Sequence, residues 1–239
     1  MNVALFRLAL RRLLLRRRSL LLAFAPMLSA LVAIIQAAEG SADSEAFASL
    51  MEQLFLPLIL PFLALVIGAS AIGEERDDAT ILYLASTPLP RLAIVVPAIV
   101  AAALTTVVLC LPGLGITIAL APGDDNGAST AGWALASVVV AACTYVAAFG
   151  ALSLRVKRPV VIGLIYVLFW EGSIATFAPS ARWLSIGAYA RAVVAGGLPS
   201  FTDENVPAIG ALAAAGVLAA IAAVATLWCG RRLARVELP

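Results

Sequence analysis

The chain has 239 residues, of which 63% are hydrophobic and only 13% are charged, and its mean hydropathy is +1.04. A soluble domain is about half apolar and about a quarter charged, so this composition excludes a water-soluble fold and indicates a membrane protein. The net charge of +2 is too small to indicate a nucleic acid partner.

Six apolar segments are long enough to cross a membrane. A spanning helix needs about 20 mainly apolar residues, because in lipid each backbone polar group must be satisfied within the helix. We predict an all-α fold with one transmembrane domain, residues 1–239, and spans at 19–37, 54–72, 93–120, 131–153, 160–177 and 206–229.

Residues 2–17, before the first span, mix apolar side chains with arginines, which suits a helix lying in the inner membrane interface. A plain cluster of topogenic charge explains them equally well. A cleaved secretory signal is a further alternative, but the apolar run is long for a signal, and its removal would leave an odd number of crossings. We therefore expect an uncleaved first helix.

Basic residues indicate the orientation. Fourteen of the sixteen Lys and Arg residues form four clusters: Arg7, Arg11, Arg12, Arg16, Arg17 and Arg18; Arg76 and Arg91; Arg155, Lys157 and Arg158; and Arg231, Arg232 and Arg235. Because cytoplasmic loops carry an excess of basic residues, each cluster predicts the inner side. Both termini are then cytoplasmic, and only Arg182 and Arg191 lie in an external loop.

The internal loop between the second and third spans begins with acidic residues, which suit a helix N-terminus. Polar and apolar residues then recur at helical spacing, and two prolines end the pattern. The sequence predicts a short amphipathic cytoplasmic helix in this loop, able to transmit force from a soluble partner to both adjoining spans. A solvated connector lying against the membrane is the alternative that the charge pattern alone favours.

The third span contains Pro97, Pro112 and the sequence Gly113-Leu-Gly115, from which we expect a kink or a broken helix. The three cysteines lie in apolar segments without paired spacing, so we interpret them as small packing residues.

The inventory of side chains excludes several chemistries. The chain contains no histidine, which excludes catalytic triads and imidazole metal sites. Its one lysine, Lys157, lies outside any P-loop pattern, so the chain lacks that device for binding ATP. We expect no catalytic residue, no metal and no cofactor in this chain.

One charge, Glu171, lies within a predicted span, about 18 Å along the helix from its inner end. An ionisable group at that depth is a candidate functional site. Alternatively it marks a turn where the span ends early and a re-entrant segment begins, paired with Arg182 or Arg191. In the external loop that follows, 179–207, we expect short re-entrant or interfacial helices. Trp183 and Tyr189 suit the aromatic belt at the outer membrane interface.

Two stretches carry a family resemblance. The segment Ile72–Arg91, with its Gly-Glu-Glu-Arg start and its Thr-Pro-Leu-Pro-Arg end, closely resembles the signature of ABC-2 type permeases. Residues Gly163–Gly172, continuing to Ala181–Ser185, are similar to the fifth-span region of small bacterial permeases of that family. Together they cover about a sixth of the chain.

The resemblance implies a membrane permease subunit of an ATP-driven exporter in the bacterial inner membrane. It implies a homodimer that docks two copies of a separate cytoplasmic ATPase, which would bind the ATP and Mg²⁺. The docking residues it implies, in a coupling helix, are Gly73, Glu74, Glu75, Arg76, Asp77, Asp78, Thr80, Tyr83, Leu84, Thr87, Pro88 and Arg91. A non-transporting membrane scaffold that anchors a cytoplasmic partner is the alternative function, and an ion-coupled transporter or channel is a weaker third.

Overall fold

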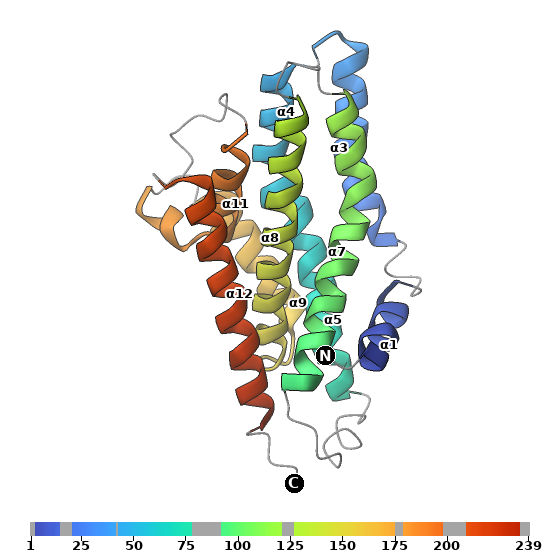
Figure 1. The fold of residues 1–239 in the computed structure, drawn as a ribbon, viewed down its shortest axis with the longest axis vertical. Helices are drawn as coiled ribbons and strands as arrows, with labels where there is room; N and C mark the ends of the chain where they lie inside the picture. The colour runs from blue at the N-terminus through green and yellow to red at the C-terminus, as the bar shows by residue number, and fades with distance from the viewer. Residues whose placement is uncertain are drawn as a thin grey trace.

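The computed structural model describes residues 3–14, 21–41, 43–77, 92–120, 127–174, 179–197 and 209–234, and within these ranges every regular element is a helix (Figure 1). The elements are α1 (Val3–Leu14), α3 (Phe24–Ala38), α4 (Ser44–Leu50), η1 (Met51–Ile59), α5 (Leu60–Asp77), α7 (Leu92–Leu120), α8 (Gly127–Ser153), α9 (Pro159–Ile165), η2 (Tyr166–Ile174), η3 (Pro179–Leu184), α11 (Ile186–Val194) and α12 (Ala211–Ala234). Of these, η1 and η2 are π-helical and η3 is a 3₁₀-helix.

Four helical stretches in the described residues are long and apolar enough to cross a membrane. They are Ser44–Ala71, Val95–Leu120, Ser129–Ser153 and Ala211–Arg232, and the shorter apolar helices Phe24–Ala38 and Pro159–Ser173 accompany them. These six stretches correspond in order to the six predicted spans.

The second of these stretches begins at Ser44, ten residues before the predicted start of the span. Its start is fixed by Asp43, whose carboxylate accepts a hydrogen bond of 2.7 Å from the backbone N–H of Ala46, as an N-cap residue does. Glu45 and Glu52, which the sequence had placed in the preceding loop, therefore lie in the helix. Acidic side chains in the first turns of a helix complement its dipole.

Helix α1 occupies residues Val3–Leu14, as expected for a helix before the first span. Its Leu13 is buried, and Phe6 and Leu10 pack against the core. The arginines Arg7 and Arg11 are exposed. The helix lies against α7 near the end of the molecule where α12 also ends (Figure 1).

Helix α8 lies at the centre of the bundle, in contact with α5, α7, α11 and α12 (Figure 1). Close packing on α5 depends on a small residue, because a Cβ atom on Gly68 would lie 2.9 Å from the carbonyl oxygen of Val146. Further along α8, the rings of Tyr145 and Phe149 stack with centroids 5.9 Å apart. Gly68 of α5 thus lets α5 and α8 pack closely, and α8 carries the stacked rings of Tyr145 and Phe149.

Of the two expectations for the third span, a kink or a broken helix, the structure contradicts the break. Helix α7 runs without interruption from Leu92 to Leu120, with Pro97 and Pro112 inside it. Such prolines are tolerated in a membrane bundle because neighbouring helices can satisfy the backbone polar groups that proline leaves without a partner. The glycine after Pro112 has a packing role instead, because a Cβ atom on Gly113 would lie 2.6 Å from the carbonyl carbon of Pro26 in α3.

Helix α5 extends further than predicted, to Asp77. The segment Gly73–Asp77 is therefore the last part of a long helix and not the first turn of a separate one. A single glycine costs a helix only about 1 kcal/mol, so Gly73 does not end it. Residues 78–91, which hold the rest of the predicted coupling helix, lie outside the described residues.

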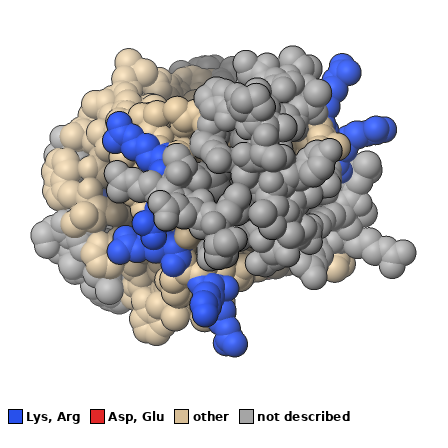
Figure 2. Space-filling model, turned by 90° about the horizontal axis from the view of Figure 1, so that it is seen from below, with Lys and Arg blue, Asp and Glu red and all other residues tan. Residues whose placement is uncertain are grey.

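Basic side chains gather at one end of the molecule. Seen from below, this face carries Lys and Arg, and no Asp or Glu of the described residues is seen on it (Figure 2). The exposed cations are Arg7, Arg11, Arg155, Lys157, Arg158, Arg231 and Arg232. Near the opposite end, by α4, the exposed charges are Glu39, Asp43 and Glu45. These exposed charges therefore separate along the long axis.

Candidate functional site

Glu171 in η2 is completely buried, with 0% of its surface exposed, and both of its carboxylate oxygens accept hydrogen bonds. The Oε1 atom accepts from the hydroxyl of Tyr166 at 2.9 Å and from the backbone N–H groups of Ile186 at 3.0 Å and Gly187 at 3.3 Å. The Oε2 atom accepts from the hydroxyl of Ser185 at 2.6 Å and from the N–H of Gly187 at 3.2 Å. The carboxylate thus fastens η2 to the start of α11.

Apart from Tyr166, the donors around this carboxylate belong to the N-terminus of α11. The first N–H groups of a helix have no partner within the helix, and together they carry a partial positive charge. Ser185 is the N-cap residue, and its Oγ accepts a 3.0 Å hydrogen bond from the N–H of Ala188. A carboxylate in this position satisfies buried donors and compensates the helix dipole at once.

The space around the carboxylate is narrow. A Cβ atom on Gly187 would lie 2.6 Å from Oε2 of Glu171 and 3.3 Å from the hydroxyl oxygen of Tyr145. Glycine at this position therefore makes room for the carboxylate. On the other side, the ring of Tyr166 packs edge to face against Phe149, with centroids 6.2 Å apart.

All nine residues of α11 are buried, so the helix lies inside the protein and not at its surface. Ser137 in α8 donates a 2.7 Å hydrogen bond to the carbonyl of Ala190, and Thr130 donates one of 2.9 Å to the carbonyl of Gly197. Short helices after the fifth span were predicted correctly. Of the two residues expected in the aromatic belt, Trp183 is exposed, whereas Tyr189 is only 7% exposed and its hydroxyl donates to the carbonyl of Trp183 at 3.0 Å.

This geometry favours the structural interpretation of Glu171. Two carboxylate oxygens have about four lone-pair sites, and five hydrogen bonds already occupy them. The carboxylate therefore has the contacts expected of a group that fixes the start of α11 against η2. The partners found for it are hydroxyl and amide groups, where the sequence had suggested Arg182 or Arg191.

A cavity of about 340 Å³ adjoins the site, between η1, η2 and α11. Its polar lining comes from Glu52, Gln53, Glu171 and Arg191, and its apolar lining includes Pro57, Leu58, Val167 and Leu168. Arg191 is only 4% exposed, and its Nε atom has no hydrogen-bond partner. The sequence had placed Arg191 in an external loop, whereas the structure places it against this cavity.

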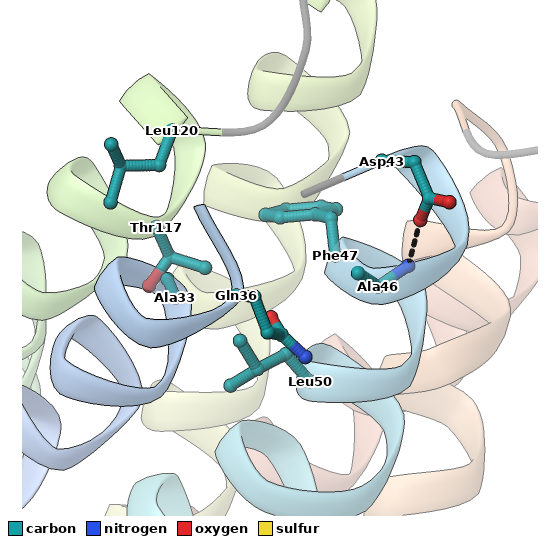
Figure 3. A pocket seen from close by; sticks show the side chains of 8 residues that line it. All are labelled: Ala33, Gln36, Asp43, Ala46, Phe47, Leu50, Thr117 and Leu120. Carbon is teal, nitrogen blue, oxygen red and sulfur yellow. Dashed lines mark hydrogen bonds between the residues drawn. The ribbon is translucent and has the colours of Figure 1, made fainter. Parts of the chain in front are cut away.

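A second, much smaller cavity of about 10 Å³ lies near the acidic end of the molecule, between α3, α4 and α7. Gln36, Phe47 and Thr117 point toward it, and the hydrogen bond between Asp43 and Ala46 lies at its edge (Figure 3). A space of this size holds about one water molecule. We therefore interpret it as a packing gap at the top of the bundle.

Sequence reasoning missed the observed hydrogen-bond partners of Glu171, which are Tyr166, Ser185, Ile186 and Gly187. Tyr166 and Glu171 are five residues apart, a spacing that shares a face in a π-helix but not in an α-helix. Nothing in the apolar pattern of residues 160–177 distinguishes these two helix types. A weak signal was available in Ser185, which is a favoured N-cap residue.

The described part of the predicted docking set, Gly73–Asp77, lies far from Glu171. The group Gly73–Asp77 ends α5 at the basic end of the molecule, whereas α11 lies toward the opposite end (Figure 1). The rest of the set, from Asp78 to Arg91, lies outside the described residues. In the part of the chain that the structure describes, no group of three or more His, Cys, Asp or Glu residues is placed to hold a metal ion.

A comparison with protein families decides the class. The family described as ABC-2 family transporter protein matches residues 17–157, which is more than half of the 239 residues. The chain belongs to the ABC-2 transporter family. This ABC-2 type permease is a multi-pass membrane protein, and the family supplies the membrane component of ABC transporters, not the ATPase. No curated protein matches the chain.

The family match covers only part of the chain, residues 17–157. It includes the whole segment Gly73–Arg91, and it ends before η2, α11 and the site around Glu171. The resemblance noted in residues 72–91 therefore lies within the matched part of this ABC-2 permease, whereas that noted in residues 163–185 lies beyond it.

Proposed function

We propose that the chain is the permease subunit of an ATP-driven exporter and that the segment Gly73–Arg91 docks a separate cytoplasmic ATPase. The observation that carries the proposal is the family match, which covers this segment. Gly73–Asp77 lies at the basic end of the bundle, and excess basic charge marks the cytoplasmic side of a bacterial inner membrane protein. The six apolar stretches then cross the membrane with both termini inside.

The docking segment is continuous with a spanning helix. Because α5 runs unbroken from Leu60 to Asp77, a force applied at Asp77 reaches the membrane through a rigid element. The same helix packs along α8, which also contacts α7, α11 and α12. ATP and Mg²⁺ would bind to the ATPase, and its closure on ATP would move α5 against this central helix.

A second copy of the chain completes the proposed complex. Helix α12 is largely uncovered in the single chain, with Leu212, Val224 and Leu227 among its exposed side chains. Apolar side chains on a membrane protein face either lipid or another subunit. A homodimer with two ATPase subunits is the arrangement that family membership supports.

Docking is tested by crosslinking. In a variant whose cysteines are replaced by alanine, we place one cysteine at Glu75 or at Tyr83 and co-express an ABC-type ATPase encoded beside the gene. A short thiol crosslinker is expected to join both variants to the ATPase. A cysteine at Glu45, which is exposed near the acidic end, is the matched control and is expected to give no product. Normal transport without a crosslink at Glu75 or Tyr83 would contradict the proposal.

A further inference from the structure

One face of helix α1 combines positive charge with an exposed apolar side chain. Arg7, Leu8 and Arg11 are all exposed, and 54% of the surface of Leu8 is accessible. Residues three and four apart are neighbours on a helix, so Arg11 lies beside both Arg7 and Leu8. The two arginines are about 6 Å apart along the helix axis. We call these three residues the outer face of α1.

The opposite face of α1 is already packed on the bundle. Leu13 is buried, and Phe6 and Leu10 pack against the core. The helix lies along the flank of α7 and also contacts α5 (Figure 1). Apolar packing therefore holds one side of α1, and its outer face is directed away from the bundle.

The position of α1 is at a boundary between membrane and water. The stretch Val95–Leu120 of α7 is long and apolar enough to cross a membrane, and α1 lies beside the basic end of the bundle, where α12 exposes Arg231 and Arg232 (Figure 1). Because α1 touches both α5 and α7, it contacts the two helices that adjoin residues 78–91.

The chemistry of the outer face fits an anionic lipid. A guanidinium group is planar and presents paired donors that match the oxygens of a phosphate. An exposed leucine beside such groups suits the boundary between head groups and acyl chains, where an amphipathic helix lies. The phosphate of a zwitterionic lipid is balanced by its own ammonium, whereas that of an anionic lipid requires an external cation. Each basic residue near an anionic surface strengthens binding about fivefold.

We propose that the outer face of α1 binds the head groups of anionic phospholipids and that the bound lipid holds α1 against α7 and α5. Arg7 and Arg11 bond the phosphates, and Leu8 enters the upper part of the acyl layer. The proposal concerns the chain alone and does not depend on ATPase docking.

The test measures hydrogen exchange of the backbone amides of α1 in the purified full chain. The chain is placed in nanodiscs of phosphatidylcholine or of phosphatidylglycerol, which differ in net charge. Amide exchange reports how often a helix opens locally. Two arginines at about fivefold each predict exchange of residues 3–14 that is about 25-fold slower in phosphatidylglycerol.

A double variant locates the effect on α1. Arg7→Gln with Arg11→Gln is expected to remove most of the difference between the two lipids. The matched control is Arg231→Gln with Arg232→Gln, which removes the same charge from exposed positions at the same end and should leave the difference at about 25-fold.

Salt provides a test that needs no variant. At 1 M salt the Debye length is about 3 Å, so the difference between the two lipids is expected to disappear in the unaltered chain. This measurement keeps the proposal testable if the double variant does not fold.

Four results would overturn the proposal. They are equal exchange of α1 in the two lipids, a difference that persists in 1 M salt, a difference undiminished in the folded Arg7→Gln, Arg11→Gln variant, and an equal loss in the control variant. Slower exchange that requires added ATPase in either lipid would likewise contradict it, because the outer face would then bind a protein and not a lipid surface.

Discussion

Replacement of Glu171 by alanine is expected to lower the free energy of unfolding by about 3–5 kcal/mol. The substitution leaves the hydroxyls of Tyr166 and Ser185 and the N–H groups of Ile186 and Gly187 without the acceptor they now share. The start of α11 is buried, so water does not replace that acceptor at low cost. The expected shift in thermal unfolding is about 10 °C, followed by tryptophan fluorescence of the purified protein in detergent.

Glu171→Gln is the matched control for this experiment. Its amide oxygen can keep the three hydrogen bonds now accepted by Oε1, while its NH₂ group replaces Oε2 and cannot accept the bonds from Ser185 and Gly187. We expect a smaller loss of about 1–2 kcal/mol. An alanine variant as stable as the unaltered chain would contradict the structural role. A stable Gln variant without transport would show instead that the carboxylate charge serves transport.

The second large effect is expected at Gly113, where α7 touches α3. A Cβ atom there would lie 2.6 Å from the carbonyl carbon and 2.8 Å from the Cβ of Pro26, so alanine would force the two helices apart. Overpacking of this kind costs about 1–3 kcal/mol. We expect Gly113→Ala to lower the unfolding temperature of the purified protein by several degrees, about 2–4 °C for each kcal/mol.

Gly115 is the matched control on the same helix, two residues away. A Cβ atom at Gly115 would have no neighbour within 4 Å, and alanine favours a helix over glycine by about 1 kcal/mol. Gly115→Ala should therefore be neutral or slightly stabilising. If both variants behave alike, the contact between Gly113 and Pro26 does not determine how α3 packs.

The helical architecture follows from the sequence because apolar length is a strong signal. Each of the six apolar stretches appeared as a helix, and the small helices between η2 and α12 were expected from the alternating residues after Glu171. The boundaries were less predictable. The second apolar stretch begins at Ser44 because Asp43 caps it, although apolar residues become dense only after Glu52.

The site around Glu171 depends on contacts that local sequence patterns do not predict. Glu171 stood out because charge is rare within a span, but its partners come from Tyr166 through π-helical spacing and from Ser185–Gly187 across a reversal of the chain. Arg191 was read as a loop residue because the sequence around it is too short to span a membrane. Only the packing of α11 against η1 brings it to a cavity.

Similarly, the unbroken course of α7 through Pro97 and Pro112 could not be predicted from residue preferences. Proline removes a hydrogen bond from any helix, and the outcome depends on whether neighbouring helices compensate for it. The extension of α5 to Asp77 also depends on two opposing effects. Gly73 lowers the stability of the helix, and the good helix formers after it raise that stability.

The most direct test of the whole account is the side of the membrane on which the loop after α5 lies. A single cysteine at Asp78 or at Glu45, in a chain without other cysteines, can be treated in intact cells with a maleimide that does not cross the membrane. The account predicts that the Glu45 variant reacts from outside and that the Asp78 variant reacts only after the cells are opened. Labelling of the Asp78 variant in intact cells would place the proposed docking segment outside the cell and contradict the account.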